Sequence, residues 1–232
     1  SLVYTGAAAN VGPVLDLYRN SASPADSDVV GRINFKGENS AGESIDYAYL
    51  TGIILDVTDG TEDGYIAIRS MLAGSDIPRI TMDGTETVIN DGSADLNFRV
   101  ESNGNANMLF VDGGEDAVGI GTIPPAWRAG YGDVGFNVGV SAALYDQTGG
   151  GVFLVNNWYR ADDNTLTYRN TNEAQYIAMD AGIFSFQTAP SGSAGAAITF
   201  TETMKIDATG AVTKPLQPAF LAKVASAQNN LA

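Results

Sequence analysis

The chain lacks both cysteine and histidine over all 232 residues. This excludes disulfides, thiol nucleophiles, imidazole bases and zinc sites built from these two residue types. Carboxylate, hydroxyl, amide, lysine, arginine and tyrosine chemistry remains. The absence of cysteine suits an extracellular particle, but it suits a short cytosolic protein nearly as well, so it says little about location.

Positive charge is scarce, because 12 Lys and Arg stand against 27 Asp and Glu and give a formal net charge of −15. Such a chain repels phosphate backbones and anionic membranes. No stretch approaches the roughly 20 apolar residues of a membrane-spanning helix. The first residues also lack the basic region and apolar core of a signal peptide. We therefore expect no nucleic-acid partner, no membrane insertion and no cofactor.

The sequence does contain a repeated hairpin pattern, at residues 80–88, 109–118 and 204–212. In each segment, apolar residues stand one and three positions before an Asp, which places them on one face of a strand. A cluster of Asp and Gly or Thr then supplies the turn, and a second strand returns. We predict that Asp83, Asp112 and Asp207 are structural turn residues.

Short strand-like runs alternate with clusters of Gly, Asn, Asp and Ser along most of the chain, which is an all-β pattern. The runs are residues 14–18, 32–35, 47–57, 65–71, 97–100, 108–111, 152–155, 176–179, 183–187 and 198–200. Evidence for a helix is confined to residues 219–232. Because Pro215 and Pro218 precede that segment, an extended backbone is favoured there over a terminal helix. We predict an all-β fold of short-stranded hairpin and meander modules.

Two prolines stiffen the chain at Pro124 and Pro125, directly after a predicted strand. This is the best internal boundary. We expect an N-terminal β module with repeated hairpins over residues 1–122, a second β module over 123–214 and an extended lead over 215–232. The chain begins without Met and has no obvious closing element, so we expect it to be part of a longer polypeptide.

Several segments of the chain resemble known modules. Residues 15–26 (LDLYRNSASPAD), 31–35 (GRINF) and 56–64 (DVTDGTEDG) resemble a module that recurs in bacteriophage tail fibres, as do 98–104 (FRVESNG), 109–114 (LFVDGG) and 118–122 (VGIGT). Residues 191–207 are similar to a further module of marine phage fibre and tail-tip proteins. Residues 217–222 (QPAFLA) look like the run-in to a trimeric globular head of the complement type.

The resemblance implies a segment of an elongated homotrimeric virion appendage, located in the tail of the extracellular particle. It implies contacts with other virion tail proteins, and attachment to a host surface glycan or protein through an adjoining head that this chain lacks. No catalysis is expected. Independently, 27 Gly residues and many Ala suit strands crowded around a common axis. The alternative is a self-sufficient monomeric β-sandwich.

Two other functions remain open on the sequence. Trp127, Trp158, Tyr159 and Arg160 could contact a glycan, together with Tyr131, Asn157 and Tyr168, which would make the chain a carbohydrate-binding adhesin. Aromatic residues of β-rich chains more often fill cores or subunit interfaces. A paired-carboxylate tailspike that degrades polysaccharide is the second alternative. With 27 acidic residues, no catalytic pair can be singled out.

The acidic loop at residues 56–63 offers oxygen ligands of the kind that calcium selects, from Asp56, Thr58, Asp59, Glu62 and Asp63. Its spacing fits neither the helix-loop-helix calcium pattern nor the Gly-rich nonapeptide pattern, so we favour a solvated turn and predict no metal site. The Gly-rich stretches at 119–121 and 149–151 do not lead into a helix, which argues against phosphate loops.

Overall fold

The computed structural model describes residues 2–3, 5–7, 11–128 and 132–217. The described residues form strands, turns and loops without a helix, which confirms the all-β prediction. The chain divides into two compact units, residues 1–96 and 97–232. The predicted lead over residues 215–232 lies almost wholly outside the described residues, as does Tyr131.

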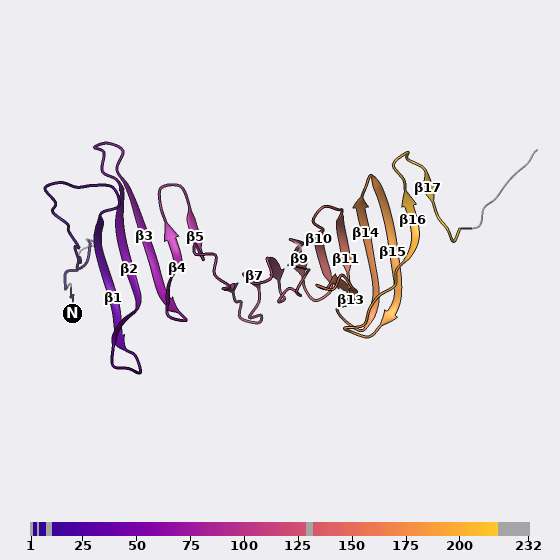
Figure 1. The fold of residues 1–232 in the computed structure, drawn as a ribbon, viewed down its shortest axis with the longest axis horizontal. Helices are drawn as coiled ribbons and strands as arrows, with labels where there is room; N and C mark the ends of the chain where they lie inside the picture. The colour runs from indigo at the N-terminus through magenta and orange to yellow at the C-terminus, as the bar shows by residue number, and fades with distance from the viewer. Residues whose placement is uncertain (1, 4, 8–10, 129–131, 218–232) are drawn as a thin grey trace, which may run out of the picture. The chain divides into compact units, whose positions relative to one another are not determined.

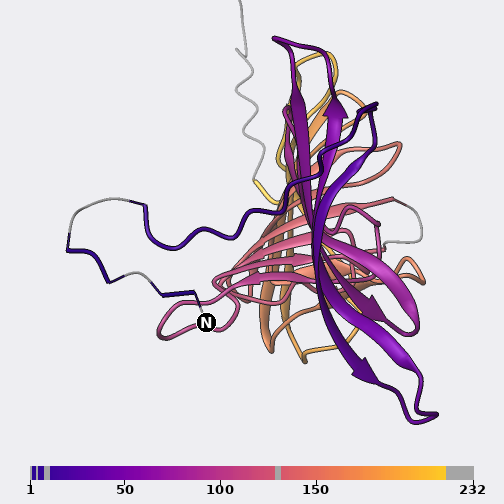
Figure 2. The same ribbon diagram turned by 90° about the vertical axis from the view of Figure 1, so that its left-hand side faces the viewer.

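The first unit is an antiparallel meander of five strands in sequence order (Figure 1). Its long strands form a twisted sheet, which Figure 2 shows after a 90° turn. Each strand is hydrogen-bonded to the next along the chain, as expected where connections are short. The strands are β1 (Val29–Glu38), β2 (Ser44–Asp56), β3 (Asp63–Leu72), β4 (Ser75–Met82) and β5 (Thr87–Ile89).

Two of the hairpins use a two-residue loop of sequence Ala-Gly. Leu72 pairs with Ser75 around Ala73 and Gly74, whose φ angles are 47° and 82°. The β14–β15 hairpin of the second unit has the same loop at Ala181 and Gly182, with φ angles of 49° and 77°. Positive φ at both positions is the requirement of a type I′ turn, whose twist matches that of the flanking strands.

The second unit contains a ten-stranded sheet and a separate two-stranded hairpin. The large sheet has the order β17-β16-β15-β14-β11-β10-β9-β8-β7-β6, and the hairpin is β12-β13. The strands are β6 (Phe98–Val100), β7 (Leu109–Asp112), β8 (Ala117–Ile120), β9 (Val134–Val138), β10 (Ala142–Asp146), β11 (Val152–Asn156), β12 (Trp158–Arg160), β13 (Leu166–Tyr168), β14 (Asn172–Asp180), β15 (Ile183–Gly192), β16 (Thr201–Ile206) and β17 (Val212–Thr213).

The predicted module boundary at 122/123 falls inside this second unit. Strands β8 and β9 pair in parallel, with Val118 opposite Phe136 and Ile120 opposite Val138. The hydrogen-bonded sheet therefore contains strands from both sides of Pro124 and Pro125 as direct neighbours. The division into compact units lies instead between Leu96 and Asn97.

Two segments predicted as strands are not strands. Residues 14–18 pair with no strand. Leu17 nevertheless packs closely over Gly31 of β1: a β-carbon added at Gly31 would lie 2.6 Å from the Leu17 Cβ. Residues 198–200 form no strand; the side chains of Ile198 and Phe200 pack against the core, whereas Thr199 is exposed. The Phe200 ring lies 4.7 Å from that of Tyr176 and 5.8 Å from that of Trp158.

Candidate interaction surface: an apolar ladder on each sheet

One face of the first sheet carries an unbroken apolar row, here called the first ladder. Its members are direct cross-strand partners, one from each of the five strands, so they project from the same face. They are Ile33, Leu50, Ile68, Ile80 and Ile89. Ile33, Ile68 and Ile89 are 37%, 41% and 46% exposed, so the row lies open to solvent in the single chain.

The neighbouring row on that face is also uncharged; it consists of Gly31, Gly52, Ile66, Met82 and Thr87. Charged side chains gather on the opposite face. There the Arg32 guanidinium lies 3.3 Å from the centroid of the Tyr49 ring, and Arg69 Nε lies 3.0 Å from Asp76 Oδ2. The first sheet therefore carries two adjacent uncharged rows on one face and these paired charges on the other.

The first unit buries very little by itself. Within its described residues only Thr51, Ala67 and Thr81 are buried. All three lie in the central strands, in the row that faces away from the ladder. None is a large apolar side chain, and it is burial of such side chains that contributes most to folding. The described residues of the first unit therefore form no hydrophobic core within one chain.

The large sheet of the second unit carries a longer row of the same kind, here called the second ladder. It crosses nine consecutive strands of the sheet, from β6 to β16, through direct cross-strand pairs. Its members are Phe98, Val111, Val118, Phe136, Leu144, Leu154, Ile177, Phe186 and Met204. Phe136, Leu144 and Leu154 are 43%, 49% and 57% exposed.

The opposite face of this sheet is covered, and it holds the aromatic core of the chain. Trp127 stacks on Tyr145 at 4.5 Å, and Trp158 meets Tyr145 edge to face at 5.9 Å. Strand β9 contributes Gly135 to this contact. A β-carbon at that position would lie 2.1 Å from Trp127 Nε1, so the indole occupies the space that a larger residue would fill.

This arrangement corrects the glycan interpretation of the two tryptophans. Trp127 and Trp158 are both 0% exposed, and Tyr168 is 5% exposed. A sugar stacks on an exposed ring face, and these rings offer none. Their indole N–H groups are buried without an acceptor among the described residues. We therefore assign both tryptophans to the core, which is the more common location for aromatic residues in β-rich chains.

The other two predicted glycan contacts, Tyr159 and Arg160, are half-buried in β12 at the edge of this core. The Tyr159 ring packs edge-on against Trp127 at 6.5 Å. Arg160 Nη1 donates to Asn164 Oδ1 at 2.8 Å, and its guanidinium lies 6.0 Å from the Tyr145 ring centroid. Both side chains are thus engaged with the core and its rim.

The structure singles out one carboxylate that the sequence did not. Asp133 is fully buried. It pairs with Arg128, whose Nε lies 3.0 Å from Asp133 Oδ2, and it accepts hydrogen bonds from the Tyr145 hydroxyl and the Thr148 backbone N–H. Burial alone would raise the pKa of Asp133, but the hydrogen bonds from Arg128, Tyr145 and Thr148 outweigh it and lower the pKa.

A general acid for glycoside hydrolysis needs a raised pKa and an approach for substrate. Asp133 has a lowered pKa and four hydrogen bonds to the surrounding chain. Its hydrogen bonds instead hold the segment at Arg128 to strand β10. The sequence around it, Gly-Tyr-Gly-Asp-Val, carries no motif that would have identified it.

The three predicted turn residues stand where a strand ends and a turn begins: Asp83 follows β4, Asp112 is the last residue of β7, and Asp207 follows β16. Asp83 Oδ1 accepts from the Thr85 and Glu86 backbone N–H groups at 2.7 and 2.9 Å. Asp207 Oδ1 accepts from those of Thr209 and Ala211 at 2.9 and 3.0 Å. The corresponding bonds of Asp112 are longer, at 3.2 and 3.3 Å. Hydrogen bonds from the threonines lower the pKa of Asp83 and of Asp207.

Two carboxylates of the acidic loop at 56–63, those of Asp56 and Glu62, accept hydrogen bonds from the same loop. Asp56 Oδ1 accepts from the Thr58 N–H at 2.8 Å, and Glu62 Oε2 accepts from the Gly60 N–H at 3.1 Å. Within the described residues no group of three or more acidic side chains is placed to hold a metal ion. Nor does that part of the chain contain a helix long and apolar enough to cross a membrane.

No family model and no curated protein matches this chain. Among solved structures, the chain aligns with the carboxy-terminal domain of the bacteriophage T5 L-shaped tail fibre. The alignment covers 100% of this chain and 99% of that chain, with 11% sequence identity and a TM-score of 0.32. A likeness of this strength supports no conclusion about fold or function.

Proposed function

We propose that this chain is a structural segment of a phage tail fibre or tail-tip appendage. In this proposal three parallel copies assemble around one axis, and the segment holds a receptor-binding head for host attachment without catalysing a reaction. The phage assignment rests on the resemblance of short segments within residues 15–64, 98–122 and 191–207 to modules of phage tail fibres and tail-tip proteins. The assembly rests on the first ladder.

The first ladder supports assembly because its own unit covers so little of this face: Leu17 packs over Gly31 in the neighbouring row, while Ile33, Ile68 and Ile89 of the ladder stay exposed. Five apolar side chains cross an uncharged face, and the described part of the unit buries only Thr51, Ala67 and Thr81. Ordering a residue costs about 1–2 kcal/mol of backbone entropy, which apolar burial must offset. Covering the ladder with further copies of the same sheet provides that burial.

The charge distribution favours copies of the same chain meeting through these faces. Each copy carries a net charge of −15, so close approach through a charged surface is opposed. The two ladders contain no charged residue, whereas Arg32, Arg69 and Asp76 lie on the other face of the first sheet. Contact through the ladders leaves these charges in water. The resemblance to fibre modules selects three copies over two.

The mass of the full chain in solution tests this proposal. Sedimentation velocity at micromolar concentration should give three times the mass of one chain. Ile68→Asp places a charge in the middle of the first ladder and should shift the protein to monomers. Ile123→Asp is the matched control, because Ile123 is also exposed and lies outside both ladders. A monomeric parent with a melting temperature independent of concentration would contradict the assembly.

The absence of catalysis and of direct receptor binding is tested separately. The chain should neither attach saturably to host cells nor shorten capsule or lipopolysaccharide chains. Saturable attachment would favour the adhesin function, and release of shorter polysaccharides would favour the tailspike function. Either result would overturn the proposed role as a spacer that positions a separate head.

A further inference from the structure

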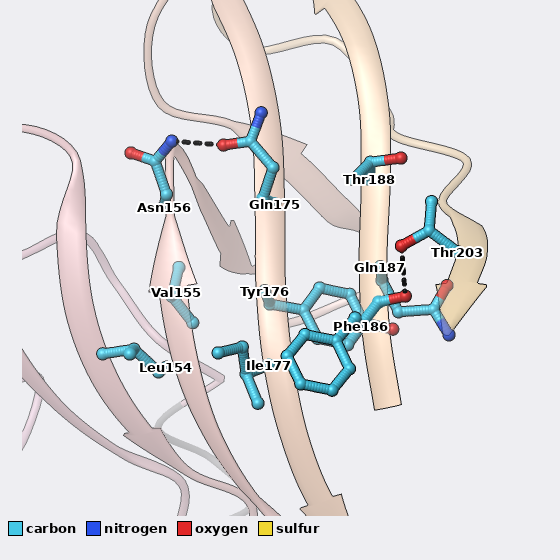
Figure 3. Close-up of a pocket in the computed structure, with 10 residues that line it drawn as sticks. All are labelled: Leu154, Val155, Asn156, Gln175, Tyr176, Ile177, Phe186, Gln187, Thr188 and Thr203. Carbon is cyan, nitrogen blue, oxygen red and sulfur yellow. Dashed lines mark hydrogen bonds between the residues drawn. The ribbon is translucent and has the colours of Figure 1, made fainter. Parts of the chain in front are cut away.

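A shallow hollow of about 330 Å³ lies on the ladder face of the second unit, over β11, β14, β15 and β16 (Figure 3). Two parallel rows of side chains border it. The first is part of the second ladder, with Leu154, Ile177 and Phe186. The second row runs beside the first and is polar: Asn156, Gln175 and Thr188 line the hollow, and the row ends at Thr201 of β16, outside the lining.

The polar row is the continuation of an apolar row on the same face of the sheet. On the strands β6 to β10 the same row consists of Val100, Leu109, Ile120, Val138 and Ala142. Ala142 then pairs with Asn156, and the row is polar from there to β16. The change occurs on a face that otherwise suits burial. Polar groups in such a place cost free energy unless their hydrogen bonds are satisfied.

The hydrogen bond between Asn156 and Gln175 uses only one of the two polar groups of each side-chain amide. Asn156 Nδ2 donates to Gln175 Oε1 at 2.6 Å, as the dashed line in Figure 3 shows. Within the described residues, no hydrogen bond uses Asn156 Oδ1 or Gln175 Nε2. The pair therefore presents one free acceptor and one free donor, and neither group is ionisable. A second copy of the same pair offers the complementary donor and acceptor.

We propose that the Asn156–Gln175 pair sets the register between copies of this chain in the assembly. This inference rests on the proposed function, and the occupant of the hollow is the ladder face of a second copy. In a cyclic trimer, Gln175 Nε2 of each copy donates to Asn156 Oδ1 of the next, and the ring closes. A continuous apolar ladder tolerates sliding, whereas a mismatched register would leave these amides buried and unpaired.

The uncharged face supports a second copy as the occupant. Every side chain in the second ladder and in the polar row is neutral, in a chain whose net charge is −15. Identical chains can approach closely here without bringing like charges together. Each copy carries the same Asn156–Gln175 pair, so in a cyclic assembly every free donor meets a free acceptor and no other molecule is needed.

Distances between copies in the full chain test the register directly. The chain has no cysteine, so Asn103→Cys introduces a single site for a nitroxide label on an exposed loop. Pulsed EPR should give one narrow distance for the otherwise unchanged chain. The double variant Asn156→Leu, Gln175→Leu should keep the trimeric mass and lose the single distance, giving several distances or a broad distribution. Thr188→Val is the control and should keep one distance.

The outcomes separate this inference from the proposed function. If the parent is monomeric, both fail. If the parent is trimeric and the double variant keeps the single narrow distance, only the register role is overturned. A single cysteine introduced as Thr188→Cys should react with a thiol reagent much more slowly in the native assembly than in the unfolded chain. Rapid reaction in a native trimer would show that the hollow is open, and would overturn the inference in favour of a small ligand such as a sugar.

A charge at this position gives a second check. Gln175→Glu places a carboxylate from each copy in the same ring, so the trimer should be lost at neutral pH and regained when the carboxylates are protonated. Gln147→Glu makes the same chemical change in the β10–β11 turn, away from the ladder face, and should leave the trimer intact at both pH values. Intact trimers of Gln175→Glu at neutral pH would overturn the buried amide ring.

Discussion

The two sheets of this protein carry the same kind of apolar ladder but differ in what lies behind it. Behind the second ladder, Trp127, Tyr145 and Trp158 form a buried aromatic core. Behind the first ladder, the buried residues of the described unit are Thr51 and Thr81 with Ala67 between them. A ladder alone therefore does not distinguish a self-supporting unit from one that depends on other copies. The opposite face decides which kind of unit it is.

Removal of the largest core side chain should have the largest effect on this comparison. Trp158→Ala leaves a cavity among Tyr145, Phe153 and Tyr176, and should lower the free energy of unfolding of the second unit by about 3–5 kcal/mol. Urea unfolding followed by tyrosine and tryptophan fluorescence measures the loss. Trp158→Phe is the control and should retain most of the stability. A loss below about 1 kcal/mol would mean that the aromatic cluster is not the core.

The buried ion pair should make the second unit sensitive to acid. The pKa of Asp133 is lowered in the folded chain. Its stabilisation is therefore complete above the unfolded pKa of about 3.9 and is lost as the pH falls through the folded value. Asp133→Asn should cost about 3–5 kcal/mol at neutral pH, because it removes the buried carboxylate that pairs with the partly buried Arg128.

The control for this prediction is Asp146→Asn, at an exposed residue of β10 without an ion pair among the described residues. Unfolding curves collected between pH 2 and pH 7 should show an acid-dependent loss for the parent and the control. The Asp133→Asn variant should lose less stability over the same range. An identical pH profile for the parent and Asp133→Asn would remove Asp133 as the source of the acid sensitivity.

A smaller loss of stability is expected for a substitution at Gly135, where the sheet leaves space for the Trp127 indole. Gly135→Ala places a β-carbon 2.1 Å from the Trp127 Nε1 position, so the indole must move. Overpacking of this kind should cost about 1–3 kcal/mol. Gly104→Ala is the matched control, because a β-carbon there meets no atom within 4 Å. Equal stability of the two variants would show that Trp127 has space to adjust.

The smallest effects are expected at the turns, which occur in both units. Asp83→Ala and Asp207→Ala each remove an acceptor from two backbone N–H groups, and should lower the melting temperature slightly. Asp112→Ala should lower it less, because its bonds are longer. Differential scanning calorimetry would rank the three variants. A loss of host attachment at unchanged stability would instead make these aspartates binding residues.

Local sequence chemistry was sufficient to predict the all-β class and many of its strands. The runs at 47–57, 65–71 and 183–187 fall within or largely within β2, β3 and β15, because alternating apolar side chains mark a strand facing a partner on one side. The Asp-containing turns are readable for a similar reason, since an Asp side chain bonds to backbone only two to four residues away. Strand β9 was missed because Gly135 interrupts its pattern, and β10 because two of its five residues are Ala, which is depleted in strands.

The sequence by itself determined the class of fold, the net charge of −15, the absence of thiol and imidazole chemistry, and the local turns. Only the tertiary structure decided that Trp127 and Trp158 are buried, that Asp133 meets Arg128, and that apolar residues far apart in the chain line up as two ladders. The physical reason is the distance along the sequence between the residues that interact. Turns and alternation depend on neighbours in sequence, whereas a ladder depends on the register of every strand pair across the sheet.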